Sequence, residues 1–143
     1  MRVVIDTNVL ISAVLKPAGN EARVIAFCQL GAYQLFLSKE LQEEYLEVSQ
    51  RKKFAKHADT MASMLKAVVA SAHQVIVTDK PCLCRDPDDD LVLACALSAD
   101  ADYLITGNRA DFPTEMTRPT IVNARTFLDT IEPADTARLE SNA

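Results

Sequence analysis

The sequence predicts an α/β domain in which a parallel sheet is covered by helices on both faces. Short runs of β-branched and aromatic residues alternate with longer stretches that have apolar residues at helical spacing. No repeat or linker interrupts the 143 residues, and 49% of them are hydrophobic. Strands that alternate with helices run parallel, because each helix carries the chain back across the sheet.

The expected elements follow one another along the whole chain. The expected strands cover residues 2–5, 33–37, 74–78, 102–106 and, as a short fifth strand, 120–122. The expected helices cover residues 8–15, 21–30, 39–50, 58–72, 88–99 and 124 to about 131.

In the first half, strand-forming residues and helix-end signals define these bounds. The first strand reads Arg-Val-Val-Ile and stops at Asp6, and the breaker Lys-Pro-Ala-Gly-Asn at 16–20 ends the first helix. Gly31 takes the C-cap place of the second helix. The second strand reads Tyr-Gln-Leu-Phe-Leu, and Ser38 directly after it can cap the third helix.

In the second half, one apolar segment has to be assigned by its length. The fourth helix can be capped by Asp59 or Thr60, and the run Gln-Val-Ile-Val-Thr reads as the third strand. Residues 91–97 are too long and too rich in alanine for a lone strand, so we expect a buried helix there. The fourth strand ends at Gly107, and Asn123 can cap the last short helix.

The composition indicates a globular protein inside the cell. The sequence has 20 acidic residues and 15 Lys and Arg residues, and the resulting net charge of −5 argues against a protein that coats nucleic acid. An enzyme acting on nucleic acid is still compatible, since acidic metal ligands lower the charge of the metal-free chain. The four cysteines lack zinc-binding spacing, and neither a signal peptide nor a membrane span is evident. We therefore expect a cytoplasmic protein with one domain over residues 1–131 and a tail over 132–143.

Acidic and amide side chains gather where the expected strands end. Asp6 follows the first strand, four aspartates stand between the third strand and the buried helix, and Asn108 and Asp111 follow the fourth strand. The four are Asp86, Asp88, Asp89 and Asp90. Ligands bind beyond the carboxyl ends of parallel strands, so we expect these groups to share one rim.

Glu44 is an acidic residue at the edge of an apolar helix face. Leu41, Tyr45 and Val48 mark the core-facing stripe of the third helix, and Glu44 borders it. A carboxylate aimed at the interior must be neutralised, hydrogen-bonded or metal-bound. A snorkelling surface residue is the alternative, but we favour a ligand.

Asp6, Glu44 and the aspartates around Asp89 are therefore expected to converge on Mg²⁺ or Mn²⁺. Carboxylate and amide oxygens suit these ions, which activate water and stabilise displacement at phosphorus, singly or as a pair. Helix capping and dipole effects contribute only about 0.3–1 kcal/mol each and explain one or two of the four aspartates. We expect Asp88 to cap the helix, Asp86 and Asp89 to face the cation, and Asp90 to be solvated.

Four motifs in the chain resemble the PIN-domain nucleases, especially the VapC-like toxin components of toxin–antitoxin pairs. They cover roughly the first 125 residues and read VIDTN (4–8), SKELQEEYLEV (38–48), RDPDDDLVLACAL (85–97) and YLITGN (103–108). The resemblance implies a three-layer α/β/α sandwich with a central parallel sheet. It also implies a ribonuclease that needs one or two Mg²⁺ or Mn²⁺ ions and leaves 5′-phosphate and 3′-hydroxyl ends.

The resemblance also implies roles for individual residues. The catalytic acidic ligands would be Asp6, Glu44 and Asp89, with Asp86 as an additional acid. The groups that orient ligands or phosphate would be Thr7, Asn8 and Thr106. Asn108 stands where many relatives carry an aspartate; its amide offers an oxygen but no charge, so a second metal would bind weakly or only with substrate. Whether Asn108 or Asp111 completes the site stays open.

Three functions remain to be compared. The first is a metal-dependent endoribonuclease toxin with RNA as substrate, an antitoxin as partner and a homodimer as a further option. The second is a catalytically weak or inactive PIN-like module that binds RNA or a protein, and the third is a receiver-like phosphoacceptor or a haloacid-type phosphatase. The third is disfavoured because Asp-Thr-Asn replaces the required Asp-x-Asp after the first strand.

The only basic cluster allows more than one use. Arg51, Lys52 and Lys53 could contact RNA phosphates or an antitoxin, or form a solvated helix end. His57 and His73 have no evident nucleophile partner, which argues against a Ser-His-Asp hydrolase.

Overall fold

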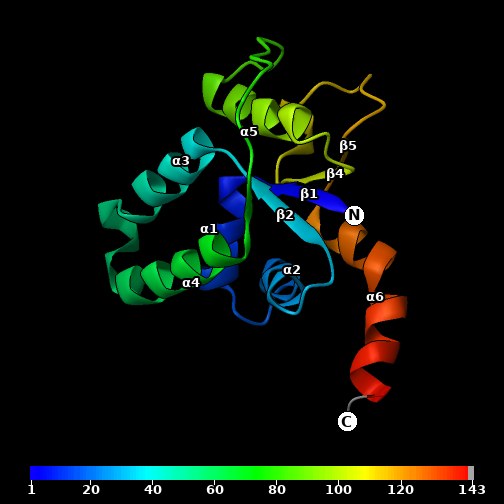
Figure 1. Ribbon diagram of the computed structural model, residues 1–143. Helices are drawn as coiled ribbons and strands as arrows, with labels where there is room; N and C mark the ends of the chain where they lie inside the picture. The colour runs from blue at the N-terminus through cyan, green and yellow to red at the C-terminus, as the bar shows by residue number, and fades with distance from the viewer. Residues whose placement is uncertain (142–143) are drawn as a thin grey trace.

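A five-stranded parallel sheet forms the centre of the protein in the order β3-β2-β1-β4-β5 (Figure 1). The computed structural model describes the backbone of residues 1–141 and the side chains of residues 1–132. The strands are β1 (Arg2–Ile5), β2 (Gln34–Leu37), β3 (His73–Gln74), β4 (Tyr103–Ile105) and β5 (Thr120–Val122). The strand order reverses direction between β1 and β4, which is where ligands bind in open parallel sheets.

Helices cover both faces of this sheet, giving the expected three-layer α/β/α sandwich (Figure 1). The helices are α1 (Thr7–Leu15), α2 (Asn20–Gln29), α3 (Lys39–Ser49), α4 (Ala58–Ser71), α5 (Pro87–Ser98) and α6 (Ala124–Ser141). Helix α5 packs over β1, β2 and β4, while α2 packs against both α1 and α6 on the other side of the sheet. Two short 3₁₀ helices, η1 (Lys52–His57) and η2 (Arg109–Asp111), complete the elements.

Burial explains why the strand residues hold the centre of the molecule. Val3, Val4 and Ile5 of β1 are completely buried, as are Leu104 and Ile105 of β4. Such uninterrupted apolar runs are typical of parallel strands buried on both faces. The two strands pair with Ile5 opposite Ile105, so that Asp6 and Thr106 emerge side by side.

The third strand is shorter than the sequence predicts. The expected strand 74–78 pairs only at His73 and Gln74, although the backbone of Val75 still donates to Leu37. Strand β2 ends at Leu37, where Ser38 begins α3, so the next residues have no neighbouring strand to pair with. The remaining β-branched residues continue as an irregular segment that leads to α5.

Two helical segments also differ from prediction. The 3₁₀ helix at Lys52–His57 was not expected, and α6 continues to Ser141 rather than ending near Ile131. The predicted short fifth strand and the buried helix α5 are confirmed. No helix in the described part of the chain combines the length and apolar character needed to cross a membrane.

Candidate active site

The candidate site lies where β1 and β4 end beneath the first turn of α5. Asp6 follows β1, Thr106 follows β4, Glu44 comes from α3, and Asp89 comes from α5. Each residue is thus delivered by a different element, and the strand ends bring these elements to one edge of the sheet.

Asp6 is a buried carboxylate held by a hydroxyl group. Its side chain is 6% exposed, and its Oδ2 accepts a hydrogen bond of 2.7 Å from the Thr106 hydroxyl. Burial raises the pKa of Asp6 above its usual value, the hydrogen bond from Thr106 opposes this, and the negative charge of Asp111 adds to it. The carboxylate is therefore fixed in place in an environment that favours a compensating positive charge.

Glu44 is confirmed to be half-buried and to face the same region. The Thr7 hydroxyl donates to its Oε2, which ties α3 to the residue next to Asp6. The Tyr45 hydroxyl donates to the backbone oxygen of Ile5 and anchors the same helix to the end of β1. Burial, together with the charges of Asp88, Asp6 and Asp89, raises the pKa of Glu44 to about 7, although the hydrogen bond from Thr7 lowers it.

The four aspartates near α5 have different roles. Asp86, rather than the expected Asp88, caps the helix, because its Oδ1 accepts from the backbone of Asp88 at 2.9 Å. Asp90, which we expected to be solvated, accepts from the backbone of Leu83 and Cys84 at 3.0 and 2.9 Å. One aspartate therefore starts the helix, and another holds the preceding loop.

Asp89 shares its electrostatic environment with Asp6. Burial and, to a smaller extent, the charges of nearby aspartates together raise the pKa of Asp89 to about 6. These aspartates are Asp6, Asp86, Asp111 and Asp88. Asp6, Glu44 and Asp89 thus influence one another electrostatically although they are far apart in the sequence. Repulsion among nearby carboxylates is unfavourable unless protons or a cation neutralise them.

The loop after β4 is joined to the loop after β1 by small polar groups. Thr106 Oγ1 donates to Asp6 and also accepts from the backbone of Asn108 at 3.1 Å. The backbone of Gly107 donates to Asn8 Oδ1 at 3.2 Å. Thr7, Asn8 and Thr106 therefore form hydrogen bonds with Glu44, Gly107 and Asp6, respectively.

Asn108 and Asp111 differ in their relation to the acidic residues. The amide side chain of Asn108 forms no hydrogen bond within the described part of the chain, and it precedes the 3₁₀ helix that carries Asp111. The charge of Asp111 acts on both Asp6 and Asp89. The position of Asp111 near these two residues depends on the 3₁₀ turn at 109–111, which the sequence pattern did not reveal.

The donor set fits a hard divalent cation, but it is not a closed cage. All candidate ligands are oxygen atoms, as Mg²⁺ and Mn²⁺ prefer. Among the described residues, no three acidic, histidine or cysteine side chains are already close enough to hold an ion. Mg²⁺ commonly binds through one or two carboxylates, with waters and substrate phosphate completing its shell, and this open arrangement is compatible with that mode.

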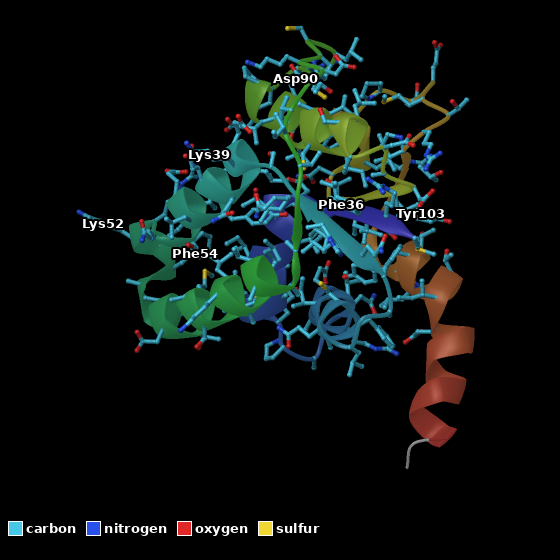
Figure 2. The ribbon with its side chains drawn as sticks, viewed as in Figure 1. Phe36, Lys39, Lys52, Phe54, Asp90 and Tyr103 are labelled. Carbon is cyan, nitrogen blue, oxygen red and sulfur yellow. The ribbon has the colours of Figure 1, made fainter. Side chains whose placement is uncertain are left out.

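Of the predicted basic residues, Arg51 is influenced by the charges of the acidic groups. Its guanidinium pairs with Glu47 at 3.0 Å, and this pairing, followed by the charges of Asp88 and Glu44, raises the pKa of Arg51. Lys52 projects into solvent past the end of α3 (Figure 2). Lys53 is also exposed, and its ammonium lies 5.1 Å from the centre of the Phe54 ring.

Comparisons with known proteins agree with this architecture. A family model described as "PIN domain" matches residues 2–110. Comparison with curated proteins finds no match. Among solved structures, the chain is similar to VapBC2 from Rickettsia felis bound to a DNA fragment from their promoter. The TM-score is 0.58 at 17% identity, over 86% of this chain and 98% of the other.

Proposed function

Because this chain belongs to the PIN-domain family, we propose that it is a Mg²⁺- or Mn²⁺-dependent endoribonuclease that hydrolyses RNA phosphodiester bonds. The supporting observation is the group of carboxylates at the ends of β1 and β4, of which Glu44 and Asp89 have pKa values raised to about 7 and about 6. Such a group is best stabilised by a divalent cation, and cation-assisted displacement at phosphorus is the chemistry that follows.

We assign the metal ligands to Asp6, Glu44 and Asp89. Asp86 is an additional acid with one oxygen free, since its other oxygen caps α5. Asn108 or Asp111 would complete the set from the loop after β4. Bound there, the cation would favour attack of water on phosphorus and would offset charge on the leaving oxygen.

The surrounding residues orient this set and the substrate. Thr106 keeps the Asp6 carboxylate directed at the site, and Thr7 does the same for Glu44. Arg51, and less directly Lys52 and Lys53, offer positive charge to the phosphates of an RNA strand that approaches past α3. These groups position the strand, while the carboxylates carry the chemistry.

We further propose that the nuclease acts in the cytoplasm as the toxin of a type II toxin–antitoxin pair. Support comes from the similarity to VapBC2, which the solved structure shows bound to DNA from its promoter. An apolar groove of about 430 Å³ between α3 and α4, with Leu46 52% exposed, offers a surface for an antitoxin segment. A homodimer remains part of the proposal without a defined interface.

RNA cleavage by the purified protein tests the enzymatic proposal. We expect cleavage with Mn²⁺ or Mg²⁺, its loss on chelation, and a decrease of roughly 100-fold or more in Asp6→Asn and Asp89→Asn. A wild-type protein that cuts no RNA under these conditions, or cleavage that both variants retain, would contradict it.

A second candidate is a catalytically weak PIN-like module that binds RNA or a protein partner. It is favoured by Asn108, which supplies no charge where many relatives carry an aspartate. This candidate predicts partner binding without measurable Mn²⁺ affinity, whereas the nuclease requires both Mn²⁺ binding and cleavage.

A further inference from the structure

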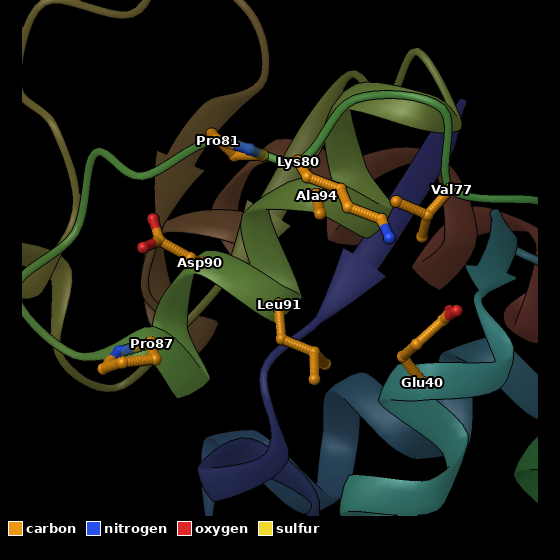
Figure 3. A pocket seen from close by; sticks show the side chains of 8 residues that line it. All are labelled: Glu40, Val77, Lys80, Pro81, Pro87, Asp90, Leu91 and Ala94. Atoms are coloured by element: carbon orange, nitrogen blue, oxygen red, sulfur yellow. The ribbon is translucent and has the colours of Figure 1, made fainter.

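We propose that a pocket beside α5 receives a guanine base of the RNA strand, next to the phosphate held at the acidic site. The inference rests on the proposed function and adds a base preference to it. The pocket lies between α5, the first turn of α3 and the irregular segment after β3, and has a volume of about 220 Å³ (Figure 3).

The pocket combines apolar walls with three charged side chains, Glu40, Lys80 and Asp90, of which Asp90 already accepts from the backbones of Leu83 and Cys84. Val77 and Pro81 come from the irregular segment, and Leu91 and Ala94 come from α5. Lys80 reaches in from the segment, and Glu40 reaches in from α3 on the other side (Figure 3). Mostly apolar walls with a few placed polar groups are typical of sites for small planar ligands.

The wall formed by the irregular segment is fixed at both ends. The backbones of Thr78 and Asp79 donate to the Ser98 hydroxyl at 2.9 and 3.4 Å, near the end of α5. Asp90 holds the other end through its two backbone hydrogen bonds at the start of the same helix. Because this wall is already ordered, little conformational entropy would be lost when a ligand binds in the pocket.

Glu40 and Lys80 offer hydrogen-bonding groups that the protein leaves available. Neither forms an ion pair within the described part of the chain, and both side chains line the pocket. A carboxylate accepts and an ammonium donates. Guanine presents a ring N–H and an amino group side by side, with the O6 acceptor next to them. It can therefore bond to Glu40 through two donors and to Lys80 through O6.

The other bases match these two groups less well. Adenine and cytosine each offer only an amino group as donor on that edge, and uracil offers a single N–H between two carbonyls. None of them can give Glu40 two donors while giving Lys80 an acceptor. The charge arrangement therefore selects guanine, whereas the apolar walls would accept any base.

The pocket lies next to the acidic site along helices α3 and α5. Glu40 lies one helical turn, roughly 5.4 Å along the axis, before Glu44 on the same side of α3. On α5, the pocket is also lined by Asp90, which directly follows Asp89. An RNA strand following the contact between α3 and α5 would thus meet the acidic site and the pocket at neighbouring nucleotides.

Nucleotide titration measures this preference without any cleavage. We would titrate GMP, AMP, CMP and UMP with Mg²⁺ into the full chain and follow backbone amide signals by NMR. GMP is expected to bind about tenfold more tightly than the others. Glu40→Gln and Lys80→Met should remove this preference, whereas Glu43→Gln, an exposed acid three residues away on α3, should keep it.

Cleavage-site mapping on RNA of mixed sequence separates the two proposals. Cuts next to guanine that become unselective in Glu40→Gln would support the pocket. Equal affinity for the four nucleotides, or an unchanged cleavage pattern in both pocket variants, would overturn it while leaving the nuclease intact. Absence of cleavage together with selective GMP binding would instead overturn the nuclease and leave the pocket as a nucleotide site.

Discussion

Thr106 shows how one small side chain can hold two parts of the candidate site. Its hydroxyl is completely buried, donates to Asp6 at 2.7 Å and accepts from the backbone of Asn108 at 3.1 Å. Partners of metal-binding carboxylates set the orientation of the ligand, and their loss commonly lowers affinity or activity by roughly 10- to 100-fold.

Thr106→Val is therefore expected to lower Mn²⁺ affinity and RNA cleavage by about 10- to 100-fold while the fold is retained. Thr106→Ser keeps the hydroxyl and should retain most of both. Calorimetry for Mn²⁺ and a cleavage assay measure the two effects. Equal affinity and activity in the valine variant would show that Asp6 needs no such partner.

Glu44 should make the stability of the metal-free protein depend on pH. Its pKa is raised from 4.5 to about 7 in the folded state, so the folded protein binds the proton more tightly than the unfolded chain. This contribution is fully present below about pH 4.5 and is lost as the pH rises through about 7. Asp89, with its pKa raised to about 6, acts in the same direction.

We expect the Tm of metal-free protein to fall between pH 5 and pH 8 relative to Glu44→Gln, and Mn²⁺ to restore it in the wild type at pH 8. Calorimetric melting at several pH values measures this. Parallel profiles for the two proteins would mean that Glu44 is not strained by burial and neighbouring charge.

Residue roles could be predicted from the sequence where spacing alone decides them. The inward position of Glu44 follows from its place beside the apolar stripe of α3, and the structure confirms that it is half-buried. The prediction that Asp88 caps α5 was wrong, because Asp86 and Asp88 both stand where a cap can form and the helix begins after Asp86. The position of Asp111 depends on a 3₁₀ turn that has no periodic signal.

At the scale of elements, α5 and the segment before it behave as one unit. Asp90 accepts two backbone hydrogen bonds from that segment, and Ser98 accepts two more near the other end of the helix. The β-branched pattern of the Gln-Val-Ile-Val-Thr run predicts a full strand and could not reveal this irregular segment. Whether the run pairs as a strand depends on where β2 ends.

Asp90→Ala is expected to loosen this segment and to lower the free energy of unfolding by about 1–3 kcal/mol, since two backbone donors lose their acceptor. Amide hydrogen exchange at Leu83 and Cys84 should become faster. Asp90→Asn retains an acceptor oxygen and serves as the matched control. Unchanged exchange in the alanine variant would contradict the assigned role.

At the scale of the whole molecule, the sheet order explains why distant residues meet. The order β3-β2-β1-β4-β5 places the ends of β1 and β4 side by side, and α5 crosses above them. The alternation of strands and helices predicted this parallel sheet, because each element carries its own periodic pattern. The length of α6 was not predicted, because Pro133 shortly after Ile131 is a helix-breaking signal that the backbone of α6 nevertheless passes.

The net charge of −5 gives the whole molecule little attraction for RNA without a cation. Carboxylates are concentrated at one edge of the sheet. A divalent ion bound there would reduce the electrostatic repulsion between this edge and RNA phosphates. If the proposed function is correct, RNA association is expected to depend on metal binding at this site, and metal binding is the property on which the proposed nuclease activity depends.

Calorimetric titration of Mn²⁺ into the full chain tests this property most directly. We predict saturable binding in the wild type and in Asp59→Asn, an exposed acid at the start of α4, and its loss or severe weakening in Asp6→Asn, Glu44→Gln and Asp89→Asn. A wild-type protein without Mn²⁺ affinity, or equal affinity in all five proteins, would contradict a shared cation site formed by residues 6, 44 and 89.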